Sequence, residues 1–431
     1  QMNEYDSNRI LDIAKSIGYI STAKISEADC YILNTCHIRE KATDKVYHDI
    51  GRVKKEFRNK KKPIFLVAGC VAQAEGDVML KREKYIDGVI GPQSYHQISS
   101  VIERIEKKRK KINSTEFEVV EKFDKLKLIK NTDSNISSFL TIQEGCDKFC
   151  KFCVVPYTRG PEHSRSFYEV LEEAKQLIEN GSKEIILLGQ NVNAYNFENK
   201  KLSDLIYELD KLHGLQRIKY TTSHPTDVTQ DLIDAHGNIN KLMPLLHLPV
   251  QSGSSKILKI MNRKHNIDEY LTIIEKLKNK NKLMKFSSDF IIAYPGENNK
   301  DFLDTLNLMK KIKFINSYSF VYSSRPGTPS AELKVIEPMI AKERLKIFQE
   351  LSGNIKKDYR KSLLNKKSKV LFENKIKDQE QYFGRDEFSN SVIVTSNKNL
   401  TGKIFDVEID KFNHNTLFGK IVVSENKNVG K

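Results

Sequence analysis

The sequence predicts an α/β protein built in three parts. We expect an N-terminal open parallel α/β domain over residues 1–130, a central partial (β/α)6 barrel over residues 131–365, and a small C-terminal β-barrel over residues 366–431. Three patterns predict this organisation: strands and helices alternate in the first part, six β/α repeats follow, and the last part has short strands with few helical stretches. A chain of 431 residues is also too long for one ordinary core.

The first part has the pattern of a parallel sheet. Residues 4–17 have helical spacing, and the apolar segments CYILN (30–34) and IFLVA (64–68) are expected to form buried strands, each followed by a turn and a helix. In such a βα arrangement Cys36 and Cys70 both come just after the carboxyl end of a strand. That edge is where open α/β sheets bind their ligands.

Three further expectations concern the same part. The helix after the second strand is expected to begin past Gly76, and residues 107–135, which are charged and weakly patterned, are expected to be a linker around a short strand pair. The basic run KKRKK (107–111) is interpreted as a solvated face or linker. Because an α/β domain normally starts with a strand, whereas this chain starts in the turn before a helix and without methionine, we expect its first strand to be missing.

The central part contains six segments with the composition of barrel strands, separated by helical stretches such as 168–178 and 301–312. The chemistry of a β/α barrel lies at the carboxyl ends of its strands. Three cysteines, Cys146, Cys150 and Cys153, follow the first of these strands and therefore fall where the active-site loops are expected. The six candidate strands are 139–142, 184–188, 217–221, 243–248, 286–292 and 317–322.

The C-terminal part predicts a small all-β barrel, with short strands at 370–372, 391–394, 402–409 and 419–423. Such barrels often bind oligonucleotides, although the fold alone does not establish this. The formal charge of +16 and the pI near 9.2 favour an anionic partner, for which nucleic acid is the natural candidate. No run of about 18 apolar residues occurs and no signal segment begins the chain, so we expect a cytoplasmic protein that does not enter the membrane.

The cysteines carry the most specific signal. The chain has only six, and Cys146, Cys150 and Cys153 stand within eight residues in a C-x3-C-x2-C pattern, which favours metal ligation over disulfides. Three thiolates at this spacing can bind three irons of a [4Fe-4S] cubane and leave the fourth iron open to S-adenosylmethionine (SAM), whose sulfonium is cleaved by an electron from the reduced cluster. The alternatives are a fully ligated electron-transfer cluster or a zinc site. Zinc would require a fourth ligand at short spacing, and His163 lies ten residues beyond Cys153.

The other cysteines are open to two interpretations. Cys36 and Cys70 each follow a strand and could meet in space, but two thiolates do not complete a cluster. Taken alone, they are more simply explained as buried structural cysteines, because free cysteine is commonly buried. Cys30, inside its strand, is interpreted as structural.

Eight motifs spread over essentially the whole chain carry a resemblance to a known family. The sequence resembles the methylthiotransferases of the radical-SAM superfamily, specifically the MiaB type, which acts on tRNA. The subfamily assignment depends on QMNEYDS and on the context of Cys36 and Cys70, in NTCHIREKA and GCVAQ. The motifs are QMNEYDS (1–7), NTCHIREKA (34–42), AGCVAQ (68–73), EGCDKFCKFCVVPYTRG (144–160), LLGQNVNAY (187–195), LPVQSG (248–253), DFIIAYPGE (289–297) and SSRPGTP (323–329).

The resemblance implies a two-cluster enzyme. It assigns an auxiliary [4Fe-4S] cluster to the N-terminal domain, a second [4Fe-4S] cluster with SAM to the radical-SAM barrel, and RNA binding to a C-terminal TRAM barrel. Cys36 and Cys70 match two of the three auxiliary ligands, and the third is expected immediately before Gln1. The metal ligands are thus Cys36, Cys70, Cys146, Cys150 and Cys153, of which the last three are also the catalytic cysteines.

The implied reaction is methylthiolation at C2 of N6-isopentenyladenosine at position 37 of tRNA. One SAM donates a methyl group to sulfur and a second supplies a 5′-deoxyadenosyl radical, because the C2–H bond is not open to acid or base chemistry. The implied partners are the tRNA anticodon loop, a flavodoxin-like electron donor and a sulfur source, and we expect a monomer. Sister enzymes act on threonylcarbamoyladenosine of tRNA or on a ribosomal protein. A noncatalytic RNA-binding metalloprotein is the competing class.

Polar residues at the ends of the barrel strands are the candidates for SAM contacts: Gln190, Asn191, Ser223, Gln251 and Ser252. Each could instead serve a turn or a cap. Arg159 and Arg165, which follow the cysteine loop, are candidates for binding RNA phosphate or the SAM carboxylate, with a salt bridge inside the barrel as the alternative. Arg385, in an FGR turn, is a candidate for RNA backbone contact.

Overall fold

The computed structural model describes residues 2–35, 40–108, 110–116, 119–127, 129, 131–132 and 134–422. Its N-terminal part contains the expected parallel sheet, with strand order β1-β2-β3-β4. Helices α1, α4 and α5 cover one face of this sheet, and α2 and α3 cover the other. The strands are β1 (Cys30–Thr35), β2 (Ile64–Gly69), β3 (Gly88–Ile90) and β4 (Ile112–Ser114), and the helices are α1 (Met2–Ser16), α2 (Glu40–Glu56), α3 (Cys70–Arg82), α4 (Ile98–Lys108) and α5 (Val119–Leu126).

Two details of this part differ from the sequence-based expectation. Helix α3 begins at Cys70 and not past Gly76, because Gly76 adopts φ 45° and ψ −121° and kinks the helix without ending it. The described part of residues 107–135 contains more secondary structure than a linker around a strand pair, since it includes β4, which pairs in parallel with β3, and helix α5. The helix expected to open at Thr35 and Cys36 falls on residues 36–39, which lie outside the described part of the chain.

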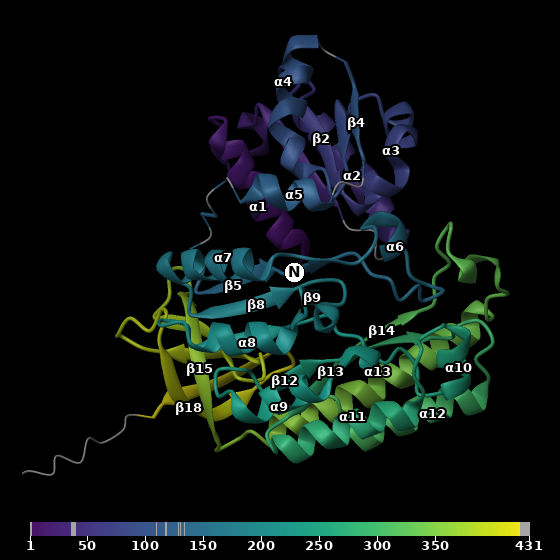
Figure 1. Cartoon of the computed structure of the whole chain (residues 1–431), viewed down its shortest axis with the longest axis vertical. Helices are drawn as coiled ribbons and strands as arrows, with labels where there is room; N and C mark the ends of the chain where they lie inside the picture. The colour runs from purple at the N-terminus through teal and green to yellow at the C-terminus, as the bar shows by residue number, and fades with distance from the viewer. Residues whose placement is uncertain are drawn as a thin grey trace, which may run out of the picture.

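The central part consists of six parallel strands, as the sequence predicts (Figure 1). They form two three-stranded sheets, β11-β8-β5 and β12-β13-β14, which a parallel bridge between Ile218 and Leu242 connects. The strands are β5 (Ser137–Thr141), β8 (Glu184–Leu188), β11 (Arg217–Tyr220), β12 (Leu245–His247), β13 (Lys285–Ile292) and β14 (Asn316–Val321). The helices are α7 (Phe167–Glu179), α8 (Leu202–Asp210), α9 (Gln230–Asn238), α10 (Ser255–Ile260), α11 (Ile267–Lys280), α12 (Asn299–Ile312) and α13 (Pro338–Lys361).

Apolar strands and outer helices build one core for this barrel. Strand β8 (EIILL) is buried at all five positions, which is typical of a parallel strand covered on both faces. Short elements complete the part: the hairpin β6 (Gln143–Glu144) and β7 (His163–Ser164), helix α6 (Val155–Thr158), and the hairpin β9 (Asn196–Phe197) and β10 (Lys200–Lys201).

The C-terminal part is the expected small β-barrel, closed in the order β15-β16-β17-β19-β18. It docks at the amino end of β11, where the Arg217 guanidinium donates to the carbonyls of Arg385 (2.8 Å) and Lys369 (2.6 Å). Strand β16 had no counterpart among the strands expected from sequence. The strands are β15 (Lys367–Lys375), β16 (Gln381–Asp386), β17 (Ser391–Thr395), β18 (Ile404–Phe412) and β19 (Thr416–Ile421). Among the described residues, no helix combines the length and apolarity needed to cross a membrane.

We expect the substitution Glu297→Gln to remove a pH dependence of stability. Glu297 is buried, and its Oε1 accepts a hydrogen bond from Arg344 at 2.9 Å. Burial raises the pKa of Glu297 from 4.5 to about 7. The folded state therefore keeps a proton that the unfolded state loses, so this group lowers the free energy of unfolding as pH rises from about 4.5 to about 7, by about 3 kcal/mol.

Urea unfolding followed by circular dichroism at pH 5 and pH 7.5 tests this expectation. The loss of stability between the two pH values should be smaller in Glu297→Gln than in the wild type. Glu350→Gln is the control, because Glu350 is exposed on α13 and lies 4.0 Å from Lys346. An identical pH dependence in Glu297→Gln and the wild type would contradict the expectation.

Candidate active site

The three clustered cysteines lie in a loop between β6 and α6, at the carboxyl end of β5. Backbone contacts hold this loop at both ends and in the middle. The N–H of Gly145 donates to Gln190 Oε1 (2.7 Å), the N–H of Cys146 donates to the carbonyl of Gly160 (3.3 Å), and the N–H of Lys151 donates to the carbonyl of Met261 (3.0 Å). The loop is therefore fixed by the barrel rather than extended into solvent.

Each of the three sulfur atoms has a nearby donor. The backbone N–H of Lys148 is directed at the sulfur of Cys146 and that of Val155 at the sulfur of Cys153. Arg263 Nη1 lies 3.5 Å from Cys150 Sγ. These donors would stabilise thiolates, which are the form that binds metal.

Burial acts in the opposite direction on the free thiols. It raises the pKa of Cys146 to about 11 and that of Cys153 to about 12. Bound iron reverses this effect, because a coordinating thiol is deprotonated by the metal.

The donor set fits an iron–sulfur cluster. Three thiols from one loop, with N–H and guanidinium donors beside them, match the ligands and the outer hydrogen bonds of a [4Fe-4S] centre. Among the described residues, no three His, Cys, Asp or Glu side chains are arranged to bind a single metal ion. In a cubane each thiolate binds a different iron, so the three cysteine sulfur atoms need not converge on one point.

Polar side chains gather at the same end of the barrel. Asp227 joins Lys148 of the cysteine loop (2.7 Å) to the Asn191 amide (2.7 Å) at the end of β8. The rings of His224 and His265 contact each other at 5.8 Å between centroids. Burial, with Arg263 nearby, lowers the pKa of both histidines, so both are neutral at pH 7.

Several of these buried polar groups have an atom without a hydrogen-bond partner in the described part of the chain. These atoms are Asn191 Oδ1, Ser223 Oγ, His224 Nε2, Arg263 Nε and His265 Nε2. Buried polar atoms normally have a partner, so a group of unpartnered ones at a strand-end site indicates a polar ligand.

The residues predicted to contact SAM fall into two groups. Asn191 and Ser223 belong to the group with unpartnered atoms. Gln190, Gln251 and Ser252 have local roles in the structure: Gln190 accepts from Gly145, the Gln251 backbone pairs with β13 at a positive φ of 77°, and Ser252 Oγ accepts from the N–H of Ser254 (3.2 Å).

Arg165 forms a salt bridge inside the barrel, whereas Arg159 forms one with the N-terminal part. Both guanidinium groups are buried, so neither is exposed to an RNA phosphate. Arg159 pairs with Asp6 Oδ2 at 2.7 Å, and Arg165 pairs with Glu173 Oε2 at 2.8 Å. Arg385 lies inside strand β16 and not in the expected turn; it is partly exposed, and its Nε donates to Glu373 at 2.9 Å.

The remaining cysteines lie in the N-terminal sheet. Cys70 is buried at the carboxyl end of β2, where α3 begins, and Cys30 is partly buried in β1. Cys36 lies outside the described residues. Helix α3 contacts α6, the short helix that follows Cys153, so Cys70 and the cysteine loop belong to neighbouring elements (Figure 1).

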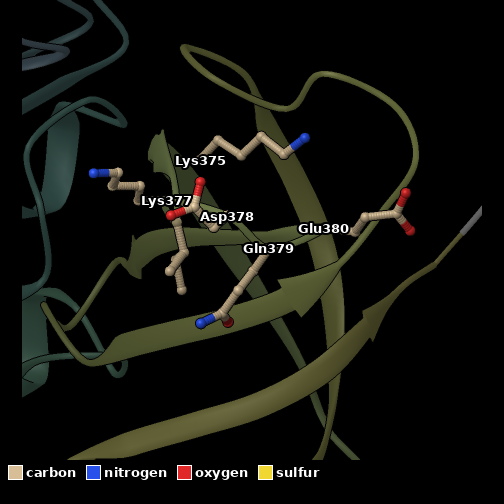
Figure 2. A pocket seen from close by; sticks show the side chains of 6 residues that line it. Lys375, Lys377, Asp378, Gln379 and Glu380 are labelled. Carbon is tan, nitrogen blue, oxygen red and sulfur yellow. The ribbon is translucent and has the colours of Figure 1, made fainter.

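A separate surface hollow at the β15–β16 turn lacks the features of a site. It is formed by residues 375–380, and the charged ends of Lys375, Lys377 and Glu380 spread apart rather than converge (Figure 2). Two lysines and two acids also leave it without net charge. We call the polar groups that have unpartnered atoms within the described residues the strand-end cluster: Asn191, Ser223, His224, Arg263 and His265. This group of side chains is the better candidate for a ligand-binding site.

Sequence reasoning missed Arg263, His224, His265 and the pair Lys148–Asp227. The position of His224 and Asp227 just after a predicted strand was an available signal. Arg263 offered none, because it follows α10 and reaches Cys150 across 113 residues of sequence.

Comparison with known proteins agrees with an iron–sulfur site in the cysteine loop. Residues 140–309 match the radical SAM superfamily, and residues 1–91 match the uncharacterized protein family UPF0004. A solved radical S-adenosylmethionine methyltransferase, TsrM from Kitasatospora setae, superposes with a TM-score of 0.55 at 11% identity, over 76% of this chain and 74% of that one. At this identity the likeness concerns the fold alone. The fold and the cysteine loop are those of a radical-SAM enzyme.

Two curated relatives define the family. A tRNA-2-methylthio-N(6)-dimethylallyladenosine synthase of Pelagibacter ubique is 58% identical over 100% of this chain and 97% of its own length. The protein of the same name from Rickettsia typhi is 48% identical over 98% of this chain and 97% of its own. The chain belongs to the tRNA-2-methylthio-N(6)-dimethylallyladenosine synthase family.

Proposed function

We propose that this chain methylthiolates C2 of N6-isopentenyladenosine at position 37 of tRNA by a radical mechanism. The observation that carries this proposal is full-length identity of 58% to a relative named for that product, combined with a loop that holds three thiols at the carboxyl end of the barrel. The C2–H bond has no acidity for a general base to use. Its replacement therefore requires radical chemistry, which agrees with the class of the barrel.

The cysteine loop holds the first [4Fe-4S] cluster through Cys146, Cys150 and Cys153. When bound, this cluster supplies the electron that cleaves SAM. Arg263 orients Cys150 by donating to its sulfur, and the N–H groups of Lys148 and Val155 do the same for the other two thiols. The burial of Cys150 excludes water from this side of the loop.

A second [4Fe-4S] cluster belongs to the N-terminal sheet in this proposal, with Cys36 and Cys70 among its ligands. The support is the place of Cys70 at the carboxyl end of β2, on an element that contacts α6 of the cysteine loop. A cluster there would lie on an element next to the one that follows the cysteine loop. Two molecules of SAM serve the reaction, one as methyl donor and one as radical source.

SAM binds at the strand-end cluster, with Asn191 and Ser223 as its direct polar contacts. Both are buried and each has an unpartnered oxygen within the described residues. Gln190, Gln251 and Ser252 shape this site through the backbone: Gln190 holds Gly145, and the other two form the turn after β12.

We expect Ser223→Ala to raise the Kd for SAM about tenfold, since a lost hydrogen bond to a buried ligand is worth about 1–1.5 kcal/mol. Equilibrium binding of SAM to cluster-loaded protein measures this value. Ser203→Ala is a matched control, because Ser203 is equally buried but hydrogen-bonds Asp231 on the outer helices. An unchanged Kd for SAM in Ser223→Ala would show that Ser223 does not contact SAM.

RNA binds through the basic surface and the C-terminal barrel, residues 366–431, and Arg385 contacts the RNA backbone. The net charge of +16 favours a polyanion. The target base leaves its stack to reach the cysteine loop, at a cost of a few kcal/mol, which is lowest for a loop base. The three parts thus act as one enzyme, and the reaction takes place between residues 1–130 and residues 131–365.

SAM cleavage requires an electron from outside the chain, and the methylthio group requires a sulfur atom. A one-electron donor of the flavodoxin type and a sulfur source are therefore required partners. A monomer that works in the cytoplasm, where tRNA is processed, completes the proposal.

Mass spectrometry of tRNA nucleosides tests the function. Expression of the full chain in cells that lack 2-methylthioadenosine should produce the 2-methylthio derivative of N6-isopentenyladenosine. Methylthiolation of threonylcarbamoyladenosine or of a ribosomal protein instead would show that N6-isopentenyladenosine is not the substrate. A colourless zinc protein that binds RNA without cleaving SAM after anaerobic reconstitution would overturn the enzyme.

A further inference from the structure

Four charged side chains form a buried network between the N-terminal sheet and the barrel. Lys122 Nζ lies 2.6 Å from Glu144 Oε1, and both side chains are fully buried. Arg159 Nη1 lies 3.6 Å from the same carboxylate oxygen, and Arg159 Nη2 lies 2.7 Å from Asp6 Oδ2. The network therefore contains two cations and two anions from four elements or their ends: α1, α5, β6 and α6.

The network includes a residue at each end of the segment that contains the clustered cysteines. Glu144 stands two residues before Cys146, and Arg159 stands six residues after Cys153. Each end is tied to a different helix of the N-terminal part, Glu144 to α5 through Lys122 and Arg159 to α1 through Asp6. The amide of Gln93, which follows β3, also donates to the carbonyl of Arg159 at 2.8 Å.

Cys70 lies close to this network. Helix α3, which begins at Cys70, contacts α6, which ends just before Arg159. Burial alone would lower the pKa of Arg159, but the Asp6 carboxylate, the Cys70 sulfur and the Glu144 carboxylate raise it well above its ordinary value. Arg159 therefore lies near Cys70, at the end of the helix that contacts α3.

Stability alone does not explain four buried charges. Buried ion pairs can often be replaced by apolar side chains of similar volume without loss of stability. Their geometry is directional, however, because each charge must meet its partner or remain unpaired. A network that joins two distinct sheets therefore favours one relative position of the two.

We propose that Asp6, Lys122, Glu144 and Arg159 are positioning residues, which fix the cysteine loop relative to Cys70 so that SAM cleavage stays coupled to methylthio transfer. This inference rests on the proposed function, in which both cysteine sites serve one reaction. The network touches neither SAM nor RNA in this proposal. It acts through the backbone at the two ends of the loop.

Arg159→Lys tests the positioning role. Lysine keeps the positive charge, but its single ammonium group cannot reproduce the two separate nitrogens that meet Asp6 and Glu144. In the full-length, cluster-loaded protein we expect the ratio of 5′-deoxyadenosine formed to nucleoside methylthiolated to rise at least about tenfold, since small misplacements of reacting groups cost up to about 100-fold. A loss of folded protein would lower both products together and leave the ratio unchanged.

Lys127→Met is the matched control. Lys127, which directly follows α5, pairs with Glu169 at 3.1 Å, so it also joins this helix to the barrel, but the pair is only partly buried. The product ratio of this variant should equal that of the wild type. A ratio in Arg159→Lys that also equals the wild-type value would overturn the inference.

Hydrogen exchange of the metal-free full chain gives a second measurement that does not depend on catalysis. In Arg159→Lys the amides of residues 144–160 should exchange faster than in Lys127→Met, and unchanged exchange there would count against the inference. If Arg159→Lys does not fold, the double variant Lys122→Met/Glu144→Gln decides by the same two measurements, because it removes one charge of each sign. If the wild type makes no methylthiolated nucleoside, the proposed function fails, and hydrogen exchange alone then decides whether the network holds the loop.

Discussion

Cys150→Ala is expected to abolish SAM cleavage, whereas Cys70→Ala is expected to retain it and lose only methylthio transfer. Cys150 is buried in the cysteine loop and receives the Arg263 guanidinium at 3.5 Å. Loss of a direct ligand should reduce cleavage more than about 100-fold, because even outer partners of metal ligands are worth about 10- to 100-fold. Cys70 belongs to the N-terminal part, at the end of β2 and the start of α3, which contacts α6.

Two products measured in one assay check this division. Anaerobically reconstituted protein with reductant, SAM and tRNA should yield 5′-deoxyadenosine in Cys70→Ala but no methylthiolated nucleoside, and neither product in Cys150→Ala. Cys30→Ala is the matched control, since Cys30 lies in β1 of the same sheet as Cys70 but inside the strand. Equal loss of cleavage in Cys70→Ala and Cys150→Ala would contradict the assignment of separate roles.

The sequence predicted the barrel well because local patterns determine its strands. All six central strands lie where apolar segments and turns indicated, and β8 matches its predicted bounds at both ends. Short elements were missed for the same reason. Strand β3 has three residues, and β16, which contains FGR (383–385), alternates buried and partly exposed positions, so neither has a strong apolar run.

The site was predicted only as far as its cysteines and strand ends. The roles of Arg159 and Arg165 depend on partners that no local pattern reveals: Arg159 meets Asp6 across 153 residues of sequence. Asn191 and Ser223 could be identified as strand-end polar groups, but only the structure shows that each has a buried oxygen without a partner among the described residues. Tertiary contacts, and not residue type, separate the binding candidates from the structural ones.

Gly145→Ala is expected to lower the iron content and to reduce SAM cleavage about 100-fold, the loss that a displacement of about 1 Å can cause. Gly145 precedes Cys146 and has a φ of 73°. A Cβ at this position would lie 1.8 Å from the carbonyl oxygen of Pro161 and 2.6 Å from that of Gly160. Because both contacts are with backbone, the cysteine loop must move to accommodate the methyl group.

Iron analysis and the 5′-deoxyadenosine assay on the purified variants measure the effect. Gly181→Ala is the matched control, since Gly181 also has a positive φ, 112°, but its Cβ would meet nothing within 4 Å. That variant bears only the conformational cost of about 1 kcal/mol and should keep its iron. If Gly145→Ala and Gly181→Ala lose stability equally and both keep full iron and full cleavage, the close approach of residues 160–161 does not position the ligands. A loss confined to Gly145→Ala would show that the backbone at the start of the loop, which the Gln190 side chain also anchors, sets where the first thiol stands.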